Sequence, residues 1–311
     1  MAKKQSKYDV YYDELINLIS GDMNISSQYV IFLTSSGEYY AINVAKVEEL
    51  IRNKNIDVVK STDSDTLTIG VTKIRENLCV LLRFDNWIGS EIEKDEKLSI
   101  IILCKYSTSR LGLIVKDVIG IQRIELDALF NGTQRDKKIA YAVEILVNGE
   151  KKLCNIFDFD QLTMDIYPNI ITMNENLVKE MQIETKQITE KYILIAEDSI
   201  LIQKQIRLLL DKMNLHYQLF DNGKTLFNYL QTNDPENISL IVTDIEMPIM
   251  DGIELVSELS KNSKYDDIPI IAHTNMSNSA IAANILDLGV LDIVDKLNLS
   301  NLKDSIMKYC R

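Results

Sequence analysis

The alternation of apolar and polar positions changes character near the middle of the chain. From residue 25 to about 165, short apolar runs alternate with turn signals such as Ser35-Ser36-Gly37 and Asn148-Gly149, a pattern typical of strands. From residue 191 to 311, short apolar runs alternate with longer amphipathic stretches, which is typical of βα repeats. The pattern predicts two domains, 25–165 and 191–311, with an N-terminal segment at 1–24 and a linker at 166–190.

The first part predicts an all-β domain. Many short strands separated by turns indicate a sandwich or small barrels. Residues 6–19 place apolar side chains at helical spacing, which predicts a short amphipathic helix that docks on another element. The predicted strands span 28–33, 38–44, 66–73, 78–83, 98–105, 110–115, 118–124, 139–147 and 151–157.

The second part predicts an α/β domain. Five βα repeats require a parallel sheet with helices on both faces, for which the doubly wound, flavodoxin-like strand order 2-1-3-4-5 is expected. Between the two parts, Tyr167-Pro168-Asn169 ends the β pattern, and the polar residues that follow predict a partly helical, flexible linker. The predicted strands span 192–196, 217–220, 240–243, 268–273 and 291–294, and the predicted helices span 201–213, 223–230, 252–259, 279–288 and 302–309.

Polar residues follow four of these five strands, where parallel strands end at one edge of the sheet. They are Glu197-Asp198, Asp244, Thr274 and Lys296. Neighbouring carboxylates repel one another unless a cation joins them, and hard oxygen ligands suit Mg²⁺. Lys296 supplies a fixed positive charge and Thr274 a hydroxyl donor. The set predicts in-line phosphoryl transfer onto the central Asp244, with the paired Glu197 and Asp198 as the better metal ligands.

Composition narrows the choice of function. The formal net charge is -12, and residues 191–311 carry 11 basic and 17 acidic side chains, so both halves are acidic. An acidic chain without a basic face argues against nucleic acid as a partner. The four cysteines are not at metal-ligand spacing, there is no signal-peptide core, and no apolar run reaches the ~20 residues of a membrane span. A reducing cytoplasm is therefore predicted. With only two histidines in the chain, His273 in its apolar run is predicted to be a core residue.

The first part resembles the CheW-like coupling domains. Its opening hairpin, 28–32 with 38–42, the segment Val47-Glu48-Glu49-Leu50, the stretch from Gly70 to Arg75 and the run from Leu111 to Val118 follow that family's order and spacing. The resemblance implies two SH3-like barrels that bind chemoreceptor tips and the regulatory domain of a histidine kinase, a short helical segment at 47–50, and partner contacts at Glu49 and Arg75. The alternative is that Glu49 and Arg75 are ordinary surface charges. Leu81 and Arg83 depart from the family pattern, so individual receptor contacts do not transfer.

The second part resembles the receiver domains of response regulators, through Glu197-Asp198, the stretch from Asp244 to Gly252, Thr274 and Lys296. The resemblance implies that a partner kinase's phosphohistidine phosphorylates Asp244. It also implies Mg²⁺ as cofactor, held by Glu197, Asp198, Asp244 and the backbone carbonyl of Glu246. Three positions depart from the pattern: Leu297 replaces the usual Pro, Ile293 replaces the usual switching aromatic residue, and Asn275 replaces a small residue.

The two parts in this order resemble CheV-type chemotaxis coupling proteins. The resemblance implies a cytoplasmic, array-associated adaptor whose coupling is tuned by phosphorylation of Asp244, or which drains phosphate from the kinase. Its only chemistry would be phosphotransfer and autodephosphorylation. The alternatives are a constitutive scaffold with a non-signalling receiver, a transcriptional regulator, and an aspartyl-phosphate phosphatase of the haloacid dehalogenase type. The phosphatase would use Glu246 as its second acid, but that class has Asp-x-Asp on its first strand, and its cap and later acids are not evident in this sequence.

Overall fold

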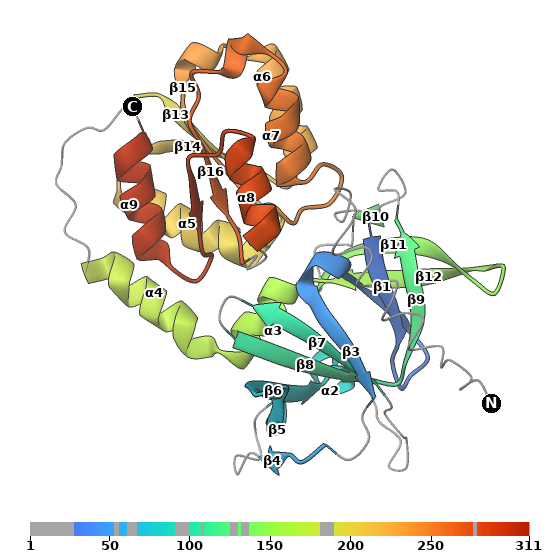
Figure 1. Ribbon diagram of the computed structural model, residues 1–311. Helices are drawn as coiled ribbons and strands as arrows, with labels where there is room; N and C mark the ends of the chain where they lie inside the picture. The colour runs from blue at the N-terminus through green and yellow to red at the C-terminus, as the bar shows by residue number, and fades with distance from the viewer. Residues whose placement is uncertain are drawn as a thin grey trace. The chain divides into compact units, whose positions relative to one another are not determined.

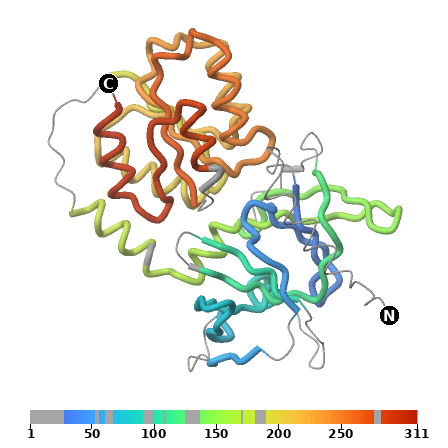
Figure 2. Tube along the Cα trace, viewed as in Figure 1, coloured from blue at the N-terminus to red at the C-terminus, as the bar shows by residue number. Residues whose placement is uncertain are grey.

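The computed structural model describes residues 28–52, 56–60, 67–90, 100–106, 109–124, 130–131, 137–180, 190–275 and 279–310. The chain divides into two compact units, Met1–Ile166 and Tyr167–Arg311. The predicted helix at 6–19 and residues 181–189 of the predicted linker lie outside the described residues. Figure 2 follows the trace through both units.

The first unit is built on two six-stranded sheets (Figure 1). In spatial order, the β1 sheet contains β10 (Phe130–Asn131), β11 (Ile139–Val147), β12 (Glu150–Phe157), β2 (Tyr39–Asn43), β1 (Gln28–Leu33) and β9 (Asp117–Arg123). The β6 sheet contains β3 (Val47–Arg52), β7 (Ile100–Tyr106), β8 (Ser109–Val115), β6 (Asn77–Arg83), β5 (Thr68–Ile74) and β4 (Val59–Lys60). The predicted all-β, SH3-like architecture is confirmed.

Aromatic side chains fill the core of this unit. Phe84 packs edge-on against Phe32 and Phe157, with ring centroids 4.9 and 4.8 Å away. Its helix α2 (Phe84–Ile88) ends at Gly89, which adopts the left-handed conformation with φ 79°. Trp87 of α2 donates from Nε1 to Asp165 Oδ2 at 2.8 Å, so it ties α2 to α3 (Phe159–Ile166), the last helix of the unit.

Segment 47–50 corrects one expectation. It begins strand β3, whereas the predicted helical turn lies just before it as the 3₁₀ helix η2 (Val44–Lys46). Strand pairing with β7 buries Val47 and Leu50, at 2% and 8% exposure, which a surface helix would leave in water. The two-residue strands β4 and β10 and the helices α2 and α3 were not predicted by the sequence pattern.

The second unit contains a five-stranded, all-parallel sheet in the order β14-β13-β15-β16-β17. In chain numbering this is the predicted 2-1-3-4-5 order. The strands are β13 (Tyr192–Ala196), β14 (His216–Phe220), β15 (Ile238–Thr243), β16 (Ile270–His273) and β17 (Asp292–Val294). The helices are α5 (Ile200–Lys212), α6 (Gly223–Thr232), α7 (Gly252–Ser260), α8 (Ser279–Asp287) and α9 (Leu299–Tyr309), with short 3₁₀ turns η4 (Pro235–Asn237) and η5 (Ser263–Tyr265).

Helices cover both faces of this sheet, as its apolar strands require. Leu194 and Ile241 belong to one core cluster with Leu226 of α6 and Leu255 of α7. Helices α5 and α9 pack together on the other face (Figure 1). A further helix, α4 (Pro168–Glu180), packs on α5 and α9 and lies in the segment for which the sequence predicts a partly helical linker.

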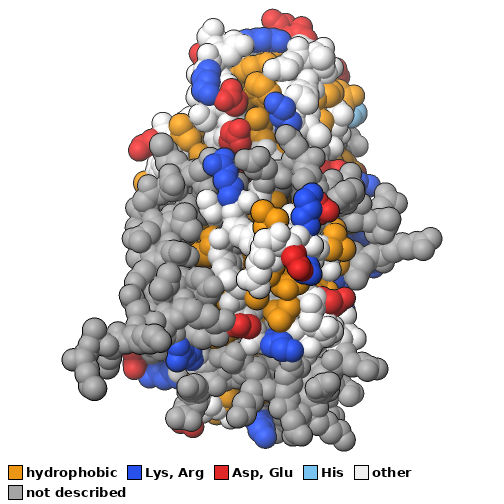
Figure 3. Space-filling view, turned by 90° about the vertical axis from the view of Figure 1, so that its right-hand side faces the viewer, with side chains coloured by type: hydrophobic (Ala, Val, Ile, Leu, Met, Phe, Trp, Pro, Cys, Tyr) orange, Lys and Arg blue, Asp and Glu red, His pale blue; other side chains and the backbone are white. Residues whose placement is uncertain are grey.

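The surface carries charges of both signs. On the face shown in Figure 3, basic and acidic side chains are interspersed with apolar ones among the described residues. Within the described residues, no helix has the length and apolar character needed to cross a membrane.

Candidate functional site

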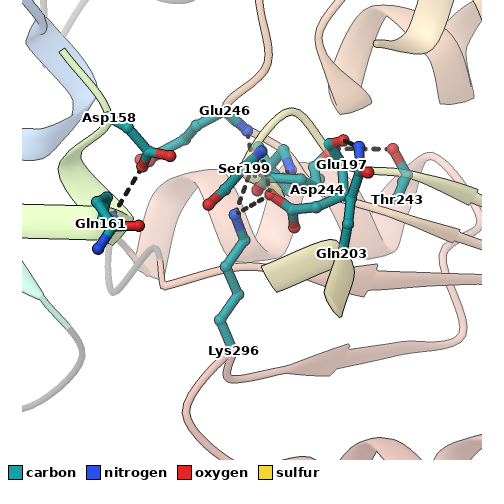
Figure 4. A network of polar contacts seen from close by, with 10 residues as sticks. Asp158, Gln161, Glu197, Ser199, Gln203, Thr243, Asp244, Glu246 and Lys296 are labelled. Atoms are coloured by element: carbon teal, nitrogen blue, oxygen red, sulfur yellow. Dashed lines mark hydrogen bonds and ion pairs between the residues drawn. The ribbon is translucent and has the colours of Figure 1, made fainter. Parts of the chain in front are cut away.

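A buried lysine joins two buried acids at the carboxyl edge of the parallel sheet (Figure 4). Lys296 Nζ lies 2.8 Å from Asp244 Oδ2 and 2.9 Å from Glu197 Oε1. The exposed fractions of these three residues are only 2%, 1% and 1%, in that order. Buried charges interact more strongly than charges at the surface, and removing one partner would leave the others unpaired at a large cost in stability. The structure therefore brings together three of the residues that the sequence predicts for the site.

Asp244 is held from both sides. Its Oδ1 accepts hydrogen bonds from the backbone N–H groups of Ile245, at 2.6 Å, and Glu246, at 3.2 Å. Its own N–H donates to the carbonyl oxygen of Ala196 at 2.8 Å, which continues the pairing of β15 with β13 beyond the strand. The carboxylate is thus fixed in orientation before any partner arrives.

Hydrogen bonds also fix the position of Glu197. Its N–H donates to the carbonyl oxygen of Phe220 at 3.0 Å, and its Oε1 accepts from the N–H of Ser199 at 3.1 Å. Gln203, one turn into α5, donates from Nε2 to the carbonyl oxygen of Glu197 at 2.6 Å. This support from Gln203 was not predicted, because nothing in the local sequence marks a helix glutamine as a partner of the preceding turn.

The acids fit a divalent metal. One carboxylate oxygen from each of Glu197, Asp198 and Asp244 can be chosen so that all three lie within 4.8 Å of one another. This is the sole grouping of that kind among the described residues. Three hard oxygen donors on one side, with room for waters on the half-buried Asp198, match what Mg²⁺ prefers. Zinc or copper would instead favour imidazole or thiolate ligands.

Glycine lets helix α7 approach the site closely. A Cβ on Gly252 would lie 2.2 Å from the backbone oxygen of Asp244. The N–H of Gly252 donates to the carbonyl oxygen of Ile245 at 3.2 Å, and Asp251 caps the helix by accepting from the N–H of Glu254 at 2.7 Å. Gly252 is therefore required by the close approach of the Asp244 backbone, and Asp251 serves as the helix cap.

The loop between Asp244 and α7 contains a strained residue. Ile249 has φ 70°, and the N–H of Met250 donates to the carbonyl oxygen of Pro248 at 2.8 Å. Together these form a γ-turn of the positive-φ kind, which is rare and costly for a β-branched residue. Strain of this kind concentrates at functional sites. The sequence pattern does not reveal this turn, because turn propensity places glycine or asparagine at such a position.

The remaining predicted residues also lie at this edge. Thr274 is buried at 3% exposure, and its N–H donates to the carbonyl oxygen of Val294 at 2.9 Å. His273, at the end of β16, is buried at 1% exposure among core residues, as predicted. Ile293 packs against the core cluster that contains Leu194 and Ile241, on the side of the sheet covered by α6 and α7. No described peptide bond is cis, so the bond between Lys296 and Leu297 is trans.

Glu49 and Arg75 meet on the β6 sheet. Arg75 Nη2 donates to Glu49 Oε1 at 2.7 Å, and the Arg75 side chain is 67% exposed. Burial raises the pKa of Glu49, and the nearby Arg75 guanidinium opposes that shift. Arg75 and Glu76 form the two-residue turn between β5 and β6 with φ 43° and 69°. Such a turn normally uses Asn-Gly, so the backbone presents Arg75 in a strained conformation.

Comparisons with known proteins agree with both halves of the fold. The family profile of the CheW-like domain matches residues 28–166. The profile of the response regulator receiver domain matches residues 193–307. Chemotaxis protein CheV1 of Helicobacter pylori is 25% identical over 297 residues, which cover 89% of this chain and 91% of CheV1. The chain has the architecture of a CheV-type protein.

Two further likenesses accompany this CheV-type architecture. The sensor histidine kinase CheAY of Helicobacter pylori is 26% identical over 263 residues, which cover 83% of this chain and 31% of that kinase. Among solved structures, the scaffolding protein TtCheW of Thermoanaerobacter tengcongensis is 17% identical and covers 43% of this chain and 84% of its own, with a TM-score of 0.37. CheV-type proteins are generally signalling adaptors that are not enzymes.

Proposed function

We propose that this CheV-type chain is a cytoplasmic chemotaxis adaptor that links chemoreceptor tips to the chemotaxis histidine kinase. In this proposal, phosphorylation of Asp244 regulates the link. The observation that carries the proposal is the preorganised Asp244–Lys296–Glu197 network at the sheet edge of a receiver that shares its chain with a CheW-like module. A carboxylate nucleophile with a lysine beside it is the arrangement that phosphoryl transfer requires, which supports regulation through this site.

The residues of the site have distinct roles in the proposed reaction. An oxygen of the Asp244 carboxylate attacks the phosphorus of the kinase's phosphohistidine, the P–N bond breaks, and the leaving imidazole nitrogen takes up a proton. Lys296 neutralises charge on the phosphoryl oxygens, and the Thr274 hydroxyl donates a hydrogen bond to one of them. Their burial keeps water from weakening these interactions.

Receiver domains commonly bind Mg²⁺ at their acidic site, and the donor set here fits that ion. We propose that Glu197, Asp198, Asp244 and the backbone carbonyl of Glu246 would hold it. The bound ion would offset the charge of the acids and of the incoming phosphoryl group. Without it, the acids would repel that group.

Labelling tests the phosphorylation proposal. The chain is incubated with Mg²⁺ and either the phosphorylated kinase or acetyl phosphate, and the phosphoprotein is separated by Phos-tag electrophoresis. Asp244→Asn, which keeps the shape and the backbone hydrogen bonds of the carboxylate, is expected to abolish the shifted band. The Asp251→Asn variant is the matched control, because it changes a nearby capping acid outside the Lys296 network. Equal labelling of wild type and Asp244→Asn would refute the assignment.

The CheW-like module carries the second half of the proposal. We propose that Glu49 and Arg75 contact a receptor or kinase surface, because a strained turn holds Arg75 out into solvent while Glu49 orients it. Co-sedimentation of the full chain with receptor–kinase arrays is expected to weaken in Arg75→Ala. The exposed cation Lys151 on another hairpin supplies the control Lys151→Ala. Loss of equal size in both variants would indicate a general charge effect in place of a specific contact.

The constitutive-scaffold alternative has its own observation, the Ile293 side chain packed in the core where a switching aromatic residue is usual in receivers. Receptor-dependent kinase activity distinguishes the two functions. Regulation by phosphorylation requires that wild type and Asp244→Asn differ in the kinase activity they support once phosphodonor is present. A constitutive scaffold supports the same activity in both.

A further inference from the structure

Helix α4 is docked on the second unit by a buried face. Val178 and Asn174 are 1% and 7% exposed, whereas Met173 on the same helix is 68% exposed. Asn174 donates from Nδ2 to Gln205 Oε1 of α5 at 2.9 Å, and Gln205 is itself 5% exposed. At the other end, Lys212 Nζ of α5 lies 3.5 Å from the carbonyl oxygen of Lys179. An amide pair buried between two helices fixes how one helix sits on the other, as buried polar pairs do elsewhere.

Both helices beneath α4 begin at the site. Helix α5 starts at Ile200, with Ser199 as its N-cap, directly after Glu197 and Asp198. Helix α9 starts at Leu299, with Asn298 as its N-cap, two residues after Lys296. The Lys296–Glu197 ion pair of 2.9 Å therefore fastens the beginning of one helix to the beginning of the other. Helix α4 contacts both helices, so its fit depends on their relative position.

The interface between α4 and α5 contains one buried hydrogen-bond donor without a partner in the part of the chain that the structure describes. The Nε2 group of Gln205 is buried and has no hydrogen-bond partner among the described residues. A buried donor without a partner weakens the contact that contains it. This unpaired donor lowers the strength of the contact without changing its geometry, so a smaller change beneath α4 shifts the docking equilibrium than a fully paired contact would require.

We propose that α4 is the output element of the receiver and that phosphorylation of Asp244 loosens its docking on α5 and α9. This inference rests on the phosphorylation proposed above. A phosphoryl group on Asp244 gives Lys296 a new anionic partner, so that the lysine no longer holds Glu197 as closely. The helices α5 and α9 then shift at their starts, and the face that Val178 and Asn174 occupy changes.

A very short connection joins α4 to the CheW-like unit. Helix α3 of the CheW-like unit ends at Ile166 and α4 begins at Pro168, with only Tyr167 between them. Helix α3 is held in its own unit by Phe159 and Leu162, which are 3% and 0% exposed, and by the Trp87–Asp165 hydrogen bond. A change in α4 is thus delivered within one residue to a helix packed in the core of the coupling module. The route does not need an aromatic switch at position 293.

Amide hydrogen exchange on the full-length chain tests the proposal. Exchange of the α4 backbone is compared with and without Mg²⁺ and beryllofluoride, which mimics the phosphoryl group, and beryllofluoride binding is followed separately by fluorine NMR. Val178→Asp places a charge in the docked face, and Met173→Asp places the same charge on the exposed face. We expect Val178→Asp to raise α4 exchange at least ~10-fold and Met173→Asp to change it less than ~2-fold.

In the wild type, beryllofluoride is expected to raise α4 exchange by ~5-fold or more, the lower end of ordinary coupling between sites. Because coupling is reciprocal, Val178→Asp must tighten beryllofluoride binding by a similar factor. Binding of beryllofluoride with unchanged or slower α4 exchange overturns this inference and leaves the proposed phosphorylation standing. Equal exchange in the two Asp variants overturns the docked face itself. Failure of the wild type to bind beryllofluoride and to be labelled overturns the proposed function, and this inference with it.

Discussion

Replacing Lys296 by methionine tests whether the buried ion-pair network has the energetic role that its geometry implies. Methionine keeps an unbranched side chain of similar length and removes only the charged end. The two carboxylates that Lys296 contacts at 2.8 and 2.9 Å would then lie in the core without their cation. No water replaces the lysine easily, because Glu197 and Asp244 are each 1% exposed.

The expected loss is large for one substitution. Removing one partner of a buried ion pair destabilises a protein by about 3–5 kcal/mol. For a domain of this size, 1 kcal/mol shifts the melting temperature by roughly 2–4 °C, so the second unit should melt ~10 °C lower. Magnesium should recover part of the loss, because acids that lack their lysine should bind the cation more tightly than those of the wild type, and each tenfold gain in affinity adds about 1.4 kcal/mol of stabilisation at saturating ion. The gap between variant and wild type should therefore be wide in EDTA and narrower in Mg²⁺.

The assay separates the two units by their probes. Trp87, the single tryptophan of the chain, is buried in the first unit, so its fluorescence follows that unit alone. Far-UV circular dichroism follows the helices, and most of the helices that the structure describes belong to the second unit. Lys261→Met is the control, since Lys261 pairs with Glu258 at the surface and such pairs contribute at most ~1 kcal/mol.

One result would refute this reasoning. If Lys296→Met in EDTA unfolds within ~1 kcal/mol of Lys261→Met, the buried network does not stabilise the fold as its geometry implies. Movement of the Trp87 transition by the same amount would show that the loss is not confined to the second unit.

Three other substitutions or conditions give clear expectations. Gly252→Ala should destabilise the second unit by ~1–3 kcal/mol and slow labelling, because its Cβ would lie 2.2 Å from the Asp244 backbone oxygen; thermal unfolding and phosphotransfer rates measure both. Ile249→Asn should stabilise by ~1 kcal/mol in urea unfolding, because asparagine tolerates φ 70° better than a β-branched residue. Burial raises the pKa of Cys79 to about 12. The unfolded thiol ionises at about pH 8.5, so above that pH the unfolded state binds fewer protons than the folded state. The urea concentration at the unfolding midpoint should therefore decrease as the pH rises from about 8 to about 10, and Cys79→Ser should make this decrease smaller.

The receiver half could be read closely from sequence because its parallel strands are buried on both faces. Strand β13 falls at the predicted 192–196, and the apolar run at 240–243 lies within β15. The acids and the lysine were found for the same reason, since each follows a strand whose end the periodicity locates. The contacts that orient them could not be found, because Gln203 and the Ile249 turn depend on backbone geometry that no periodicity encodes.

The coupling half was harder at its short elements. Strands of two residues such as β4 and β10 are shorter than any periodic signal. Segment 47–50 was mistaken for a helix because its two acids hide the burial of Val47 and Leu50, which the partner strand β7 creates. Helix α4 shows the same limit, because its polar sequence conceals a docked face built around Asn174, whose buried partner lies 31 positions away.

The strand pairing of the β1 sheet determines when the first unit can fold during synthesis on the ribosome. Strand β1 pairs with β9, and β2 pairs in parallel with β12, which ends at Phe157. The sheet is therefore incomplete until nearly the whole first unit has left the ribosome, and its long loop closures make its folding slow. The receiver, whose strands pair mostly with near neighbours in the chain, emerges afterwards. During synthesis, the coupling module can complete its β1 sheet only after almost all of its own residues have emerged. A chain shortened before β12 would expose an unpaired edge of β2, and exposed strand edges promote aggregation.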